Sequence, residues 1–161
     1  MESHEFDEEE FFGAIERSGA RALLIGRRAL IAIGLPLVTF DYDYWVHIDD
    51  IERFNAALEA LEHYPSVPPE EARKRGRYSI ENGEHIDVMV ARSKGTGDAA
   101  LTFDEAWASR EKVVFTERVS IAVPRAEDLV RTKRWASRNK DLADIQMIEA
   151  VLLQKKRGGA L

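Results

Sequence analysis

The spacing of hydrophobic and polar positions changes from segment to segment along the chain and predicts both helices and strands. Phe6–Ser18 carries apolar residues at helical spacing among acidic ones, which predicts an amphipathic helix. Arg21–Ile25 is a short apolar run typical of a buried strand, and Arg27–Ile33 is expected to form a short helix. Phe40–His47 is rich in aromatic and β-branched residues that alternate between two faces, which predicts a second strand.

The sequence after His47 also predicts both helices and strands. A helix with an apolar stripe is expected from Asp49 to about Tyr64, and the proline-rich segment Pro65–Lys74 is expected to be a connecting loop. Asn82 and Gly83 form a pair that favours a tight turn between two strands. The remaining expected elements are strands at Arg77–Ile80 and His85–Val90, two short strands within Lys112–Val123, and helices at Arg125–Ala136 and Lys140–Gln154.

This order of elements predicts an α/β (α+β) fold in which helices flank a mixed sheet. The 161 residues are about the length of one domain, and no repeat or linker divides them. We therefore expect a single domain over residues 1–161, with 1–7 and 155–161 frayed.

Composition favours a folded protein that does not enter a membrane. Hydrophobic residues make up 45% of the chain and charged residues 32%, which is typical of soluble domains. The longest apolar run, Ala29–Val38, is shorter than the roughly 18–20 residues of a membrane helix, and the acidic N-terminus differs from a signal peptide. A cytoplasmic location is therefore expected, with no membrane partner.

The sequence contains no cysteine, which excludes disulfides and cysteine-ligated zinc. Carboxylates and four histidines remain as metal ligands, so a hard cation that prefers oxygen is favoured. The net charge of −6 argues against broad, non-specific binding to nucleic acid. Basic clusters occur at Arg73–Arg77, Arg131–Lys140 and Lys155–Arg157, and a solvated surface is the more common role of such clusters.

Two aspartates inside the strand Phe40–His47 are the main candidates for chemistry, because aspartate is a poor strand former. Asp41 and Asp43 share a face about 6–7 Å apart, so both carboxylates can converge on one cation. Asp87 lies on another predicted strand and completes a cluster if the two strands are neighbours. Three ionised carboxylates repel one another without a multivalent cation, and magnesium is the first candidate, with manganese as a substitute. The alternative is that these are exposed acids on an edge strand and near a turn.

The segment LLIGRRALIAIGLPLVTFDYDYWV resembles the nucleotidyltransferase superfamily with the DNA polymerase β-type core. It is most similar to the bacterial minimal nucleotidyltransferases and abortive-infection-type toxin domains. In that family a strand, a glycine turn, a short helix and a loop with Arg-x-Thr lead to Asp-x-Asp on a strand. Here Gly26 and Arg27 stand at the glycine turn, thirteen residues separate this pair from Asp41, and Thr39 matches the threonine. Asp87 resembles the third acid of the family, which arrives on a later strand.

The C-terminal run LVRTKRWASRNKDLADIQMI looks like the Lys…Ala…Arg-x-Lys-Asp-x-x-Asp-Ile pattern of relatives in the same group. Its basic positions are Lys133, Arg138 and Lys140. Ordinary ion pairs within helices are an equally simple role for these side chains. The resemblance extends over about residues 20–150 and implies a nucleotidyltransferase-type fold with C-terminal helices.

The resemblance also implies an activity, the transfer of a nucleoside monophosphate from a nucleoside triphosphate such as ATP to a hydroxyl group. The acceptor would be a protein, an RNA end or a small molecule, since toxin–antitoxin systems and antibiotic-modifying enzymes use this core. Asp41 and Asp43 would hold magnesium against phosphate oxygens, and Asp87 would bind a second metal or accept the proton of the attacking hydroxyl. The implied nucleotide-binding residues are Gly26, Arg27, Thr39, Lys133, Arg138 and Lys140.

Two positions depart from the family pattern. Arg27 stands where a second small residue is usual, and Leu37 stands where many relatives have an arginine before the threonine. The bulk of Arg27 can obstruct the approach of the backbone to a phosphate, or its guanidinium can itself bind the phosphate. Obstruction by Arg27 and the missing positive charge at Leu37 favour an alternative function, an inactive module of the same fold that binds a nucleotide or another protein. The three aspartates favour the enzyme, because clustered acids without a metal reduce stability. No feature of the sequence indicates an oligomeric state.

His85 is a further candidate, because it precedes Asp87 by two residues on the same predicted face. There it can contact a substrate or a metal. A partly exposed strand histidine without such a role is the more common case. The other histidines lack zinc-ligand spacing.

Overall fold

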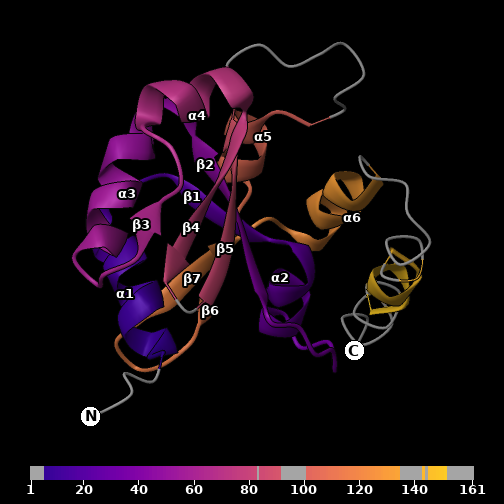
Figure 1. Ribbon diagram of the computed structural model, residues 1–161. Coiled ribbons are helices and arrows are strands. Elements are labelled where there is room, and N and C mark those ends of the chain that lie inside the picture. The colour runs from indigo at the N-terminus through magenta and orange to yellow at the C-terminus, as the bar shows by residue number, and fades with distance from the viewer. Residues whose placement is uncertain (1–5, 83, 92–100, 135–142, 144, 152–161) are drawn as a thin grey trace.

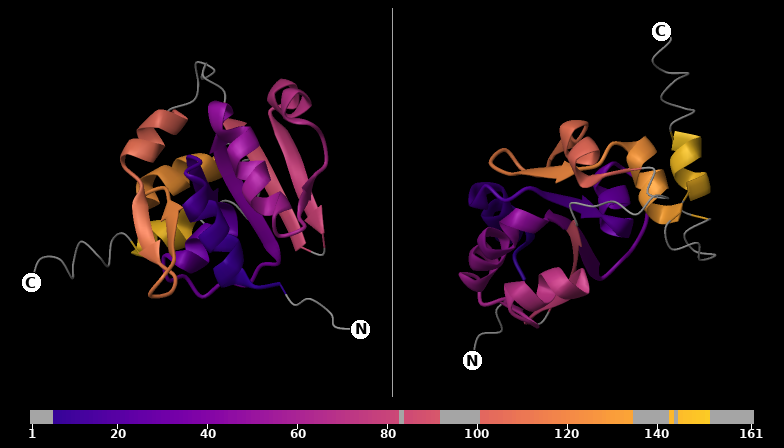
Figure 2. Two further views of the ribbon diagram at one scale, coloured as in Figure 1. Left: turned by 90° about the vertical axis from the view of Figure 1, so that its left-hand side faces the viewer. Right: turned by 90° about the horizontal axis from the view of Figure 1, so that it is seen from above.

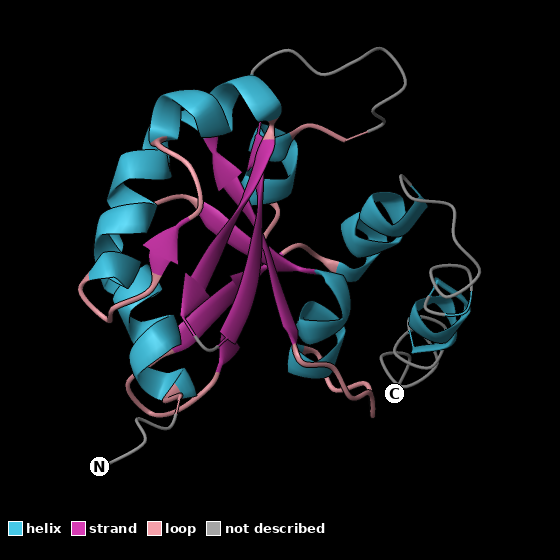
Figure 3. Cartoon of the chain, in the orientation of Figure 1, coloured by secondary structure: helices cyan, strands magenta, loops and turns pink. Residues whose placement is uncertain are grey.

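The computed structural model describes residues 6–82, 84–91, 101–134, 143 and 145–151. Its centre is a five-stranded sheet in the order β1-β2-β5-β4-β3, and a separate two-stranded sheet is formed by β6 and β7 (Figures 1 and 3). The strands are β1 (Ala22–Ile25), β2 (Asp41–His47), β3 (Tyr64–Pro65), β4 (Arg77–Asn82), β5 (Glu84–Ala91), β6 (Glu111–Val114) and β7 (Ser120–Val123). This confirms the predicted α/β fold with a mixed sheet and flanking helices.

Strands β2 and β5 pair in parallel at the centre of the large sheet, whereas the other paired strands of both sheets are antiparallel. The pairing of β4 with β5 confirms the predicted hairpin around Asn82. The predicted strand pair within Lys112–Val123 corresponds to β6 and β7.

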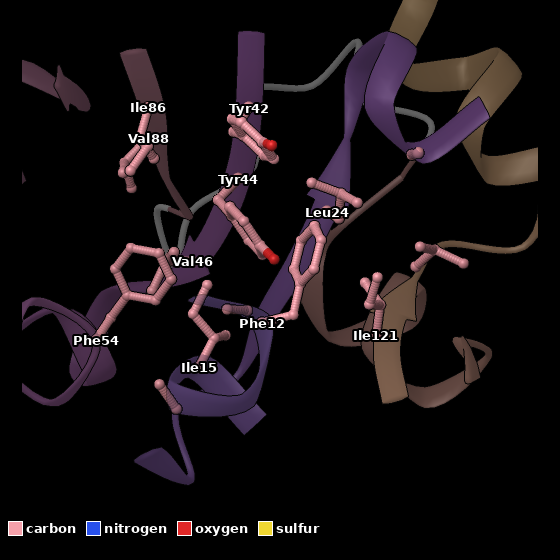
Figure 4. Packing of buried hydrophobic residues seen from close by; sticks show 14 of the residues in the cluster. Phe12, Ile15, Leu24, Tyr42, Tyr44, Val46, Phe54, Ile86, Val88 and Ile121 are labelled. Atoms are coloured by element: carbon pink, nitrogen blue, oxygen red, sulfur yellow. The ribbon is translucent and has the colours of Figure 1, made fainter. Parts of the chain in front are cut away.

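Helices cover one face of the large sheet. These are α1 (Glu8–Ser18), α3 (Ile51–Glu59), which follows a 3₁₀ turn at Ile48–Asp50, and α4 (Pro69–Arg75) (Figures 1 and 2). Their buried side chains meet those of alternate strand positions, including Tyr42, Tyr44 and Val88 (Figure 4). Burial of this apolar surface is the main stabilising contribution to the fold.

The opposite face of the sheet carries a smaller apolar cluster at one end. Trp45 of β2 packs edge-on against Phe103 of α5 (Phe103–Ala108), with ring centroids 5.0 Å apart. Figure 2, seen from above, shows α5, β6 and β7 on the side of the molecule opposite α3 and α4. Helix α2 (Gly26–Ala32) continues directly from β1, and α6 (Ala126–Arg134) follows β7. Residues 145–151 are also helical.

The prediction of a loop at Pro65–Lys74 is wrong, because most of that segment forms α4. Pro69 begins the helix, where the lack of an N–H has no cost, and Gly76 ends it in the left-handed region at φ 79°. Helix α5 was not predicted either. It begins after Thr102, whose hydroxyl oxygen accepts a hydrogen bond from the Glu105 backbone N–H at 3.2 Å.

The N-terminal residues that the structure describes are part of the fold. The Phe6 ring lies 5.1 Å from that of Phe11, and the Asp7 carboxylate caps α1 by accepting from the Glu10 N–H at 3.1 Å. Within the described ranges, no helix combines the length and the apolar character needed to cross a membrane.

Candidate active site

The acidic residues of β2 and β5 lie side by side on the sheet face opposite Tyr42 and Tyr44. In the parallel pairing, Asp43 is opposite Asp87 and Asp41 is opposite His85. Paired positions on neighbouring strands are about 4.8 Å apart and point to the same face. The two strands that carry Asp43 and Asp87 are thus neighbours, which was the condition for an acidic cluster.

Gly26 packs directly against this acidic face. It has φ +71°, and a Cβ placed on it would lie 2.5 Å from Asp43 Oδ2 and 3.2 Å from Asp43 Cγ. The contact arises because β1 and β2 are antiparallel, with Ile25 opposite Asp43, so the chain turns into α2 beside the carboxylate. Both the positive φ and the close approach of Asp43 favour glycine here.

His85 extends the polar face beyond the aspartates. Its Nε2 lies 3.1 Å from Asp87 Oδ1, and its Nδ1 lies 3.9 Å from Glu81 Oε1 on β4. The side chains of His85 and Asp87 are both about half exposed, at 50% and 47%. The expected partly exposed histidine is thus found, and the structure adds its contact with Asp87.

Arg28 holds the segment that leads into Asp41, a role that the sequence did not reveal. Its Nη2 donates to the Thr39 carbonyl at 2.9 Å, and its guanidinium lies 4.1 Å from the centre of the Tyr42 ring. Burial raises the pKa of the Tyr42 hydroxyl, so this ring stays neutral. The Thr39 hydroxyl, predicted to bind nucleotide, accepts from the Asp41 N–H at 3.2 Å and so helps to position the first aspartate.

The structure describes only some of the other residues that were predicted to bind nucleotide or that depart from the family pattern. Arg27 follows Gly26 at the start of α2 and is partly exposed. Leu37 packs against the main core. The backbone of Lys133 lies in α6, whereas Arg138 and Lys140 lie outside the described residues. The predicted roles of these residues in nucleotide binding remain predictions.

The donor set on this face suits a hard divalent cation, because carboxylate oxygens are the ligands that magnesium prefers. The strand register brings Asp43 and Asp87 together, and Asp41 lies two residues earlier on the same face. In the part of the chain that the structure describes, no three Asp, Glu or His side chains already form a metal-binding group. The metal site remains a prediction that requires the carboxylates to turn toward one another.

Comparison with known proteins shows that the fold of this chain is similar to that of several solved structures. No family model matches the sequence, and no curated protein matches it either. Among solved structures, a solution structure of the antibiotic-resistance factor ANT(2'')-Ia is similar with a TM-score of 0.63 and 12% identity, over 89% of this chain and 80% of that one. A crystal structure of ANT(2'')-Ia with adenylyl-2''-tobramycin matches with a TM-score of 0.63 and 14% identity, over 91% and 88% of the two chains.

A third similar structure is a proposed nucleotidyltransferase from Thermotoga maritima, with a TM-score of 0.55 and 10% identity, over 94% of this chain and 90% of that one. Each of the three matches spans most of both chains. The chain therefore has a nucleotidyltransferase-type fold, as the sequence resemblance implied.

Proposed function

We propose that the chain is a metal-dependent nucleotidyltransferase that moves a nucleoside monophosphate from a nucleoside triphosphate to a hydroxyl acceptor. The observation that carries the proposal is the placement of Asp43 opposite Asp87 on parallel strands, with Gly26 packed against Asp43. A purely structural sheet has little use for two facing carboxylates, which repel each other. The similarity to solved nucleotidyltransferases supports the same conclusion.

Asp41, Asp43 and Asp87 are the proposed ligands of magnesium, for which manganese is a substitute. A cation bound there would neutralise charge on the phosphate oxygens. The side chains of this face would also keep the triphosphate in place beside Gly26, whose backbone turns at φ +71° against Asp43. The guanidinium of Arg27 would add a bidentate contact to a phosphate.

The proposed reaction is a displacement at the α-phosphorus. The acceptor oxygen forms a bond to the α-phosphorus, the bond from that atom to the bridging oxygen breaks, and pyrophosphate leaves with the bonding electrons. When its carboxylate does not bind a metal, Asp87 accepts the proton of the attacking hydroxyl, and His85, 3.1 Å from that carboxylate, stabilises its orientation.

The acceptor belongs to one of three classes, which are a protein hydroxyl, an RNA end and a small-molecule hydroxyl. The crystal structure of ANT(2'')-Ia contains an adenylylated small molecule, adenylyl-2''-tobramycin. Small-molecule hydroxyls are therefore the first acceptors to test.

Thermal unfolding with magnesium and each nucleoside triphosphate tests the binding part of the proposal. A nucleotide at about 100 times its Kd adds roughly 2.7 kcal/mol to the stability of the folded state. For a chain of this length that raises the Tm by roughly 5–11 °C. Asp41→Asn/Asp43→Asn should abolish the rise, and the control Asp49→Asn should keep it, because Asp49 is exposed beyond the far end of β2.

Release of pyrophosphate in the presence of candidate acceptors tests the chemical step. If no nucleoside triphosphate raises the Tm of the wild-type chain with magnesium present, the proposal fails. A Tm rise without pyrophosphate release from any acceptor class supports the alternative, an inactive nucleotide-binding module. The core packing of Leu37, where relatives have an arginine, is the observation that favours this alternative.

A further inference from the structure

A cavity of about 190 Å³ lies on the other side of β2 from the acidic face. Its apolar walls come from Phe12 and Ile15 of α1, Ala22 of β1 and Ile121 of β7, and Tyr44 of β2 also lines it. The volume exceeds the roughly 150 Å³ of a protein cavity that holds benzene. It is smaller than the roughly 300–1,000 Å³ of sites for drug-sized ligands, so it suits a single substituted ring and excludes a nucleotide.

The Tyr44 hydroxyl gives this cavity a polar group. The residue is only 2% exposed, and the close-up shows its oxygen directed toward Phe12 and Leu24 and away from Ile86 and Val88 (Figure 4). Burial raises the pKa of the Tyr44 hydroxyl well above its ordinary value, so it stays protonated. In the described part of the chain, no hydrogen bond to this oxygen is formed, and Tyr44 lines the cavity.

A buried hydroxyl without a partner costs roughly 1–3 kcal/mol relative to one that is hydrogen-bonded. A ligand or water in the cavity that bonds to the Tyr44 oxygen removes this cost. The site therefore favours an occupant with a hydrogen-bonding group at its inner end.

The outer part of the cavity carries a positively charged group in a fixed position. Arg110 Nη1 donates to the Trp107 carbonyl at 2.8 Å, and the guanidinium lies 3.9 Å from the centre of the Trp107 ring. Lys112 adds a second positive charge, against one negative charge from Glu16. Glu16 also accepts a hydrogen bond from the Ser120 N–H at 3.4 Å. The charges that line the cavity thus favour an anion.

We propose that this cavity is a second binding site that takes a small aromatic carboxylate with a polar ring substituent. The ring lies between the apolar side chains of α1 and β7, the substituent bonds to the Tyr44 hydroxyl, and the carboxylate pairs with Arg110. The site is independent of the proposed transferase activity, because alternate residues of β2 point to opposite faces of the sheet.

Titration of the full chain with 4-hydroxybenzoate, followed by NMR of the backbone amides, tests this proposal. The amides of Ala22 and Ile121 should shift and saturate with a Kd in the millimolar range or tighter. Arg110→Gln and Tyr44→Phe should each raise the Kd at least about fivefold, because each removes one hydrogen-bonding partner. Arg118→Gln is the control, since Arg118 is exposed and does not line the cavity.

4-Hydroxybenzyl alcohol and 4-hydroxybenzylamine separate the contribution of charge from that of the ring. Both should bind at least about fivefold more weakly than the carboxylate. The proposal is overturned if the carboxylate gives no saturable shifts, if the amine binds as tightly, or if Arg110→Gln titrates like Arg118→Gln. If Tyr44→Phe does not fold, the comparison of the two arginine variants decides the result.

Discussion

Gly26→Ala tests whether the turn between β1 and α2 is built around the Asp43 carboxylate. The new methyl group would lie 2.5 Å from Asp43 Oδ2 and 3.3 Å from Asp43 Cβ. The separation from Oδ2 is too short for a real contact, so the Asp43 carboxylate must shift away from the new methyl group. Gly19→Ala is a matched control, because Gly19 has φ +72° against +71° for Gly26, and its new methyl group would meet only Arg53 at 3.9 Å.

The expected difference in stability follows from three contributions, of which the two variants share the first two. Both variants place alanine in the left-handed region, which costs roughly 1–2 kcal/mol, and both gain roughly 0.4–1 kcal/mol because alanine restricts the unfolded chain. Gly26→Ala alone forces Asp43 away from its rotamer, which adds roughly 0.5–1.5 kcal/mol. We therefore expect Gly26→Ala to destabilise the chain by about 1 kcal/mol more than Gly19→Ala, which lowers its Tm by roughly 2–4 °C more.

Urea unfolding followed by circular dichroism measures this difference, and a double-mutant cycle assigns it. In an Asp43→Ala background the carboxylate is absent, so Gly26→Ala should cost no more than Gly19→Ala. Equal destabilisation by Gly26→Ala and Gly19→Ala in the wild-type chain would show that the Asp43 carboxylate does not restrict this turn. An extra cost of Gly26→Ala that persists in the Asp43→Ala background would show the same.

Two further predictions concern the core and the pH dependence of stability. Tyr78→Phe should destabilise the chain by roughly 1–3 kcal/mol in urea unfolding, because the Tyr78 hydroxyl donates to the buried Asn55 side chain. The exposed control Tyr64→Phe should change the stability little, and equal effects of the two variants would contradict this reasoning. Burial alone would raise the pKa of Asp50, but hydrogen bonds from the Arg21 guanidinium and N–H lower it below its ordinary value. The ionised Asp50 therefore stabilises the fold above about pH 4, and this contribution is lost as the pH falls through the lowered pKa. Asp50→Asn should be less stable than wild type at neutral pH, and the difference measured by urea unfolding should shrink below about pH 4; a constant difference would contradict the assignment.

The sequence predicted those parts of the fold that depend on periodicity. The alternation in Phe40–His47 separates Asp41 and Asp43 from Tyr42 and Tyr44, and the structure confirms that the tyrosines are buried while Asp41 is exposed and Asp43 only partly buried. The two faces of this strand could be predicted because neighbouring residues of any strand point to opposite faces, independently of the rest of the fold.

Helices α4 and α5 were missed although local signals for them exist. The sequence of α4 has a proline at its start, acids in its first turn, bases in its last turn and Gly76 after it. The three prolines of the segment outweigh these signals, because proline is also typical of loops. For α5, Thr102 with Glu105 three residues later is a capping signal, but the helix that follows it is short.

The contacts within the candidate site depend on pairing between distant segments, which no local pattern fixes. Gly26 meets Asp43 only because β1 pairs with β2 in the register that places Ile25 opposite Asp43. The hydrogen bond from Arg28 to Thr39 depends likewise on how the loop before β2 returns to α2. The sequence therefore indicated candidate residues but not their contacts.

The alternation in β2 has a consequence for how this chain can change. Tyr44 lies in the core and Asp43 on the acidic face, so neighbouring side chains of β2 occupy opposite faces of the sheet. Deletion or insertion of one residue between Tyr42 and Tyr44 would turn the part of the strand on one side of the change over, so that its core residues would face outward and its polar residues inward. Substitutions can alter the two faces separately, but a change in length within β2 would disrupt the core and the acidic face together. We therefore expect this strand to tolerate variation in residue type far better than variation in length.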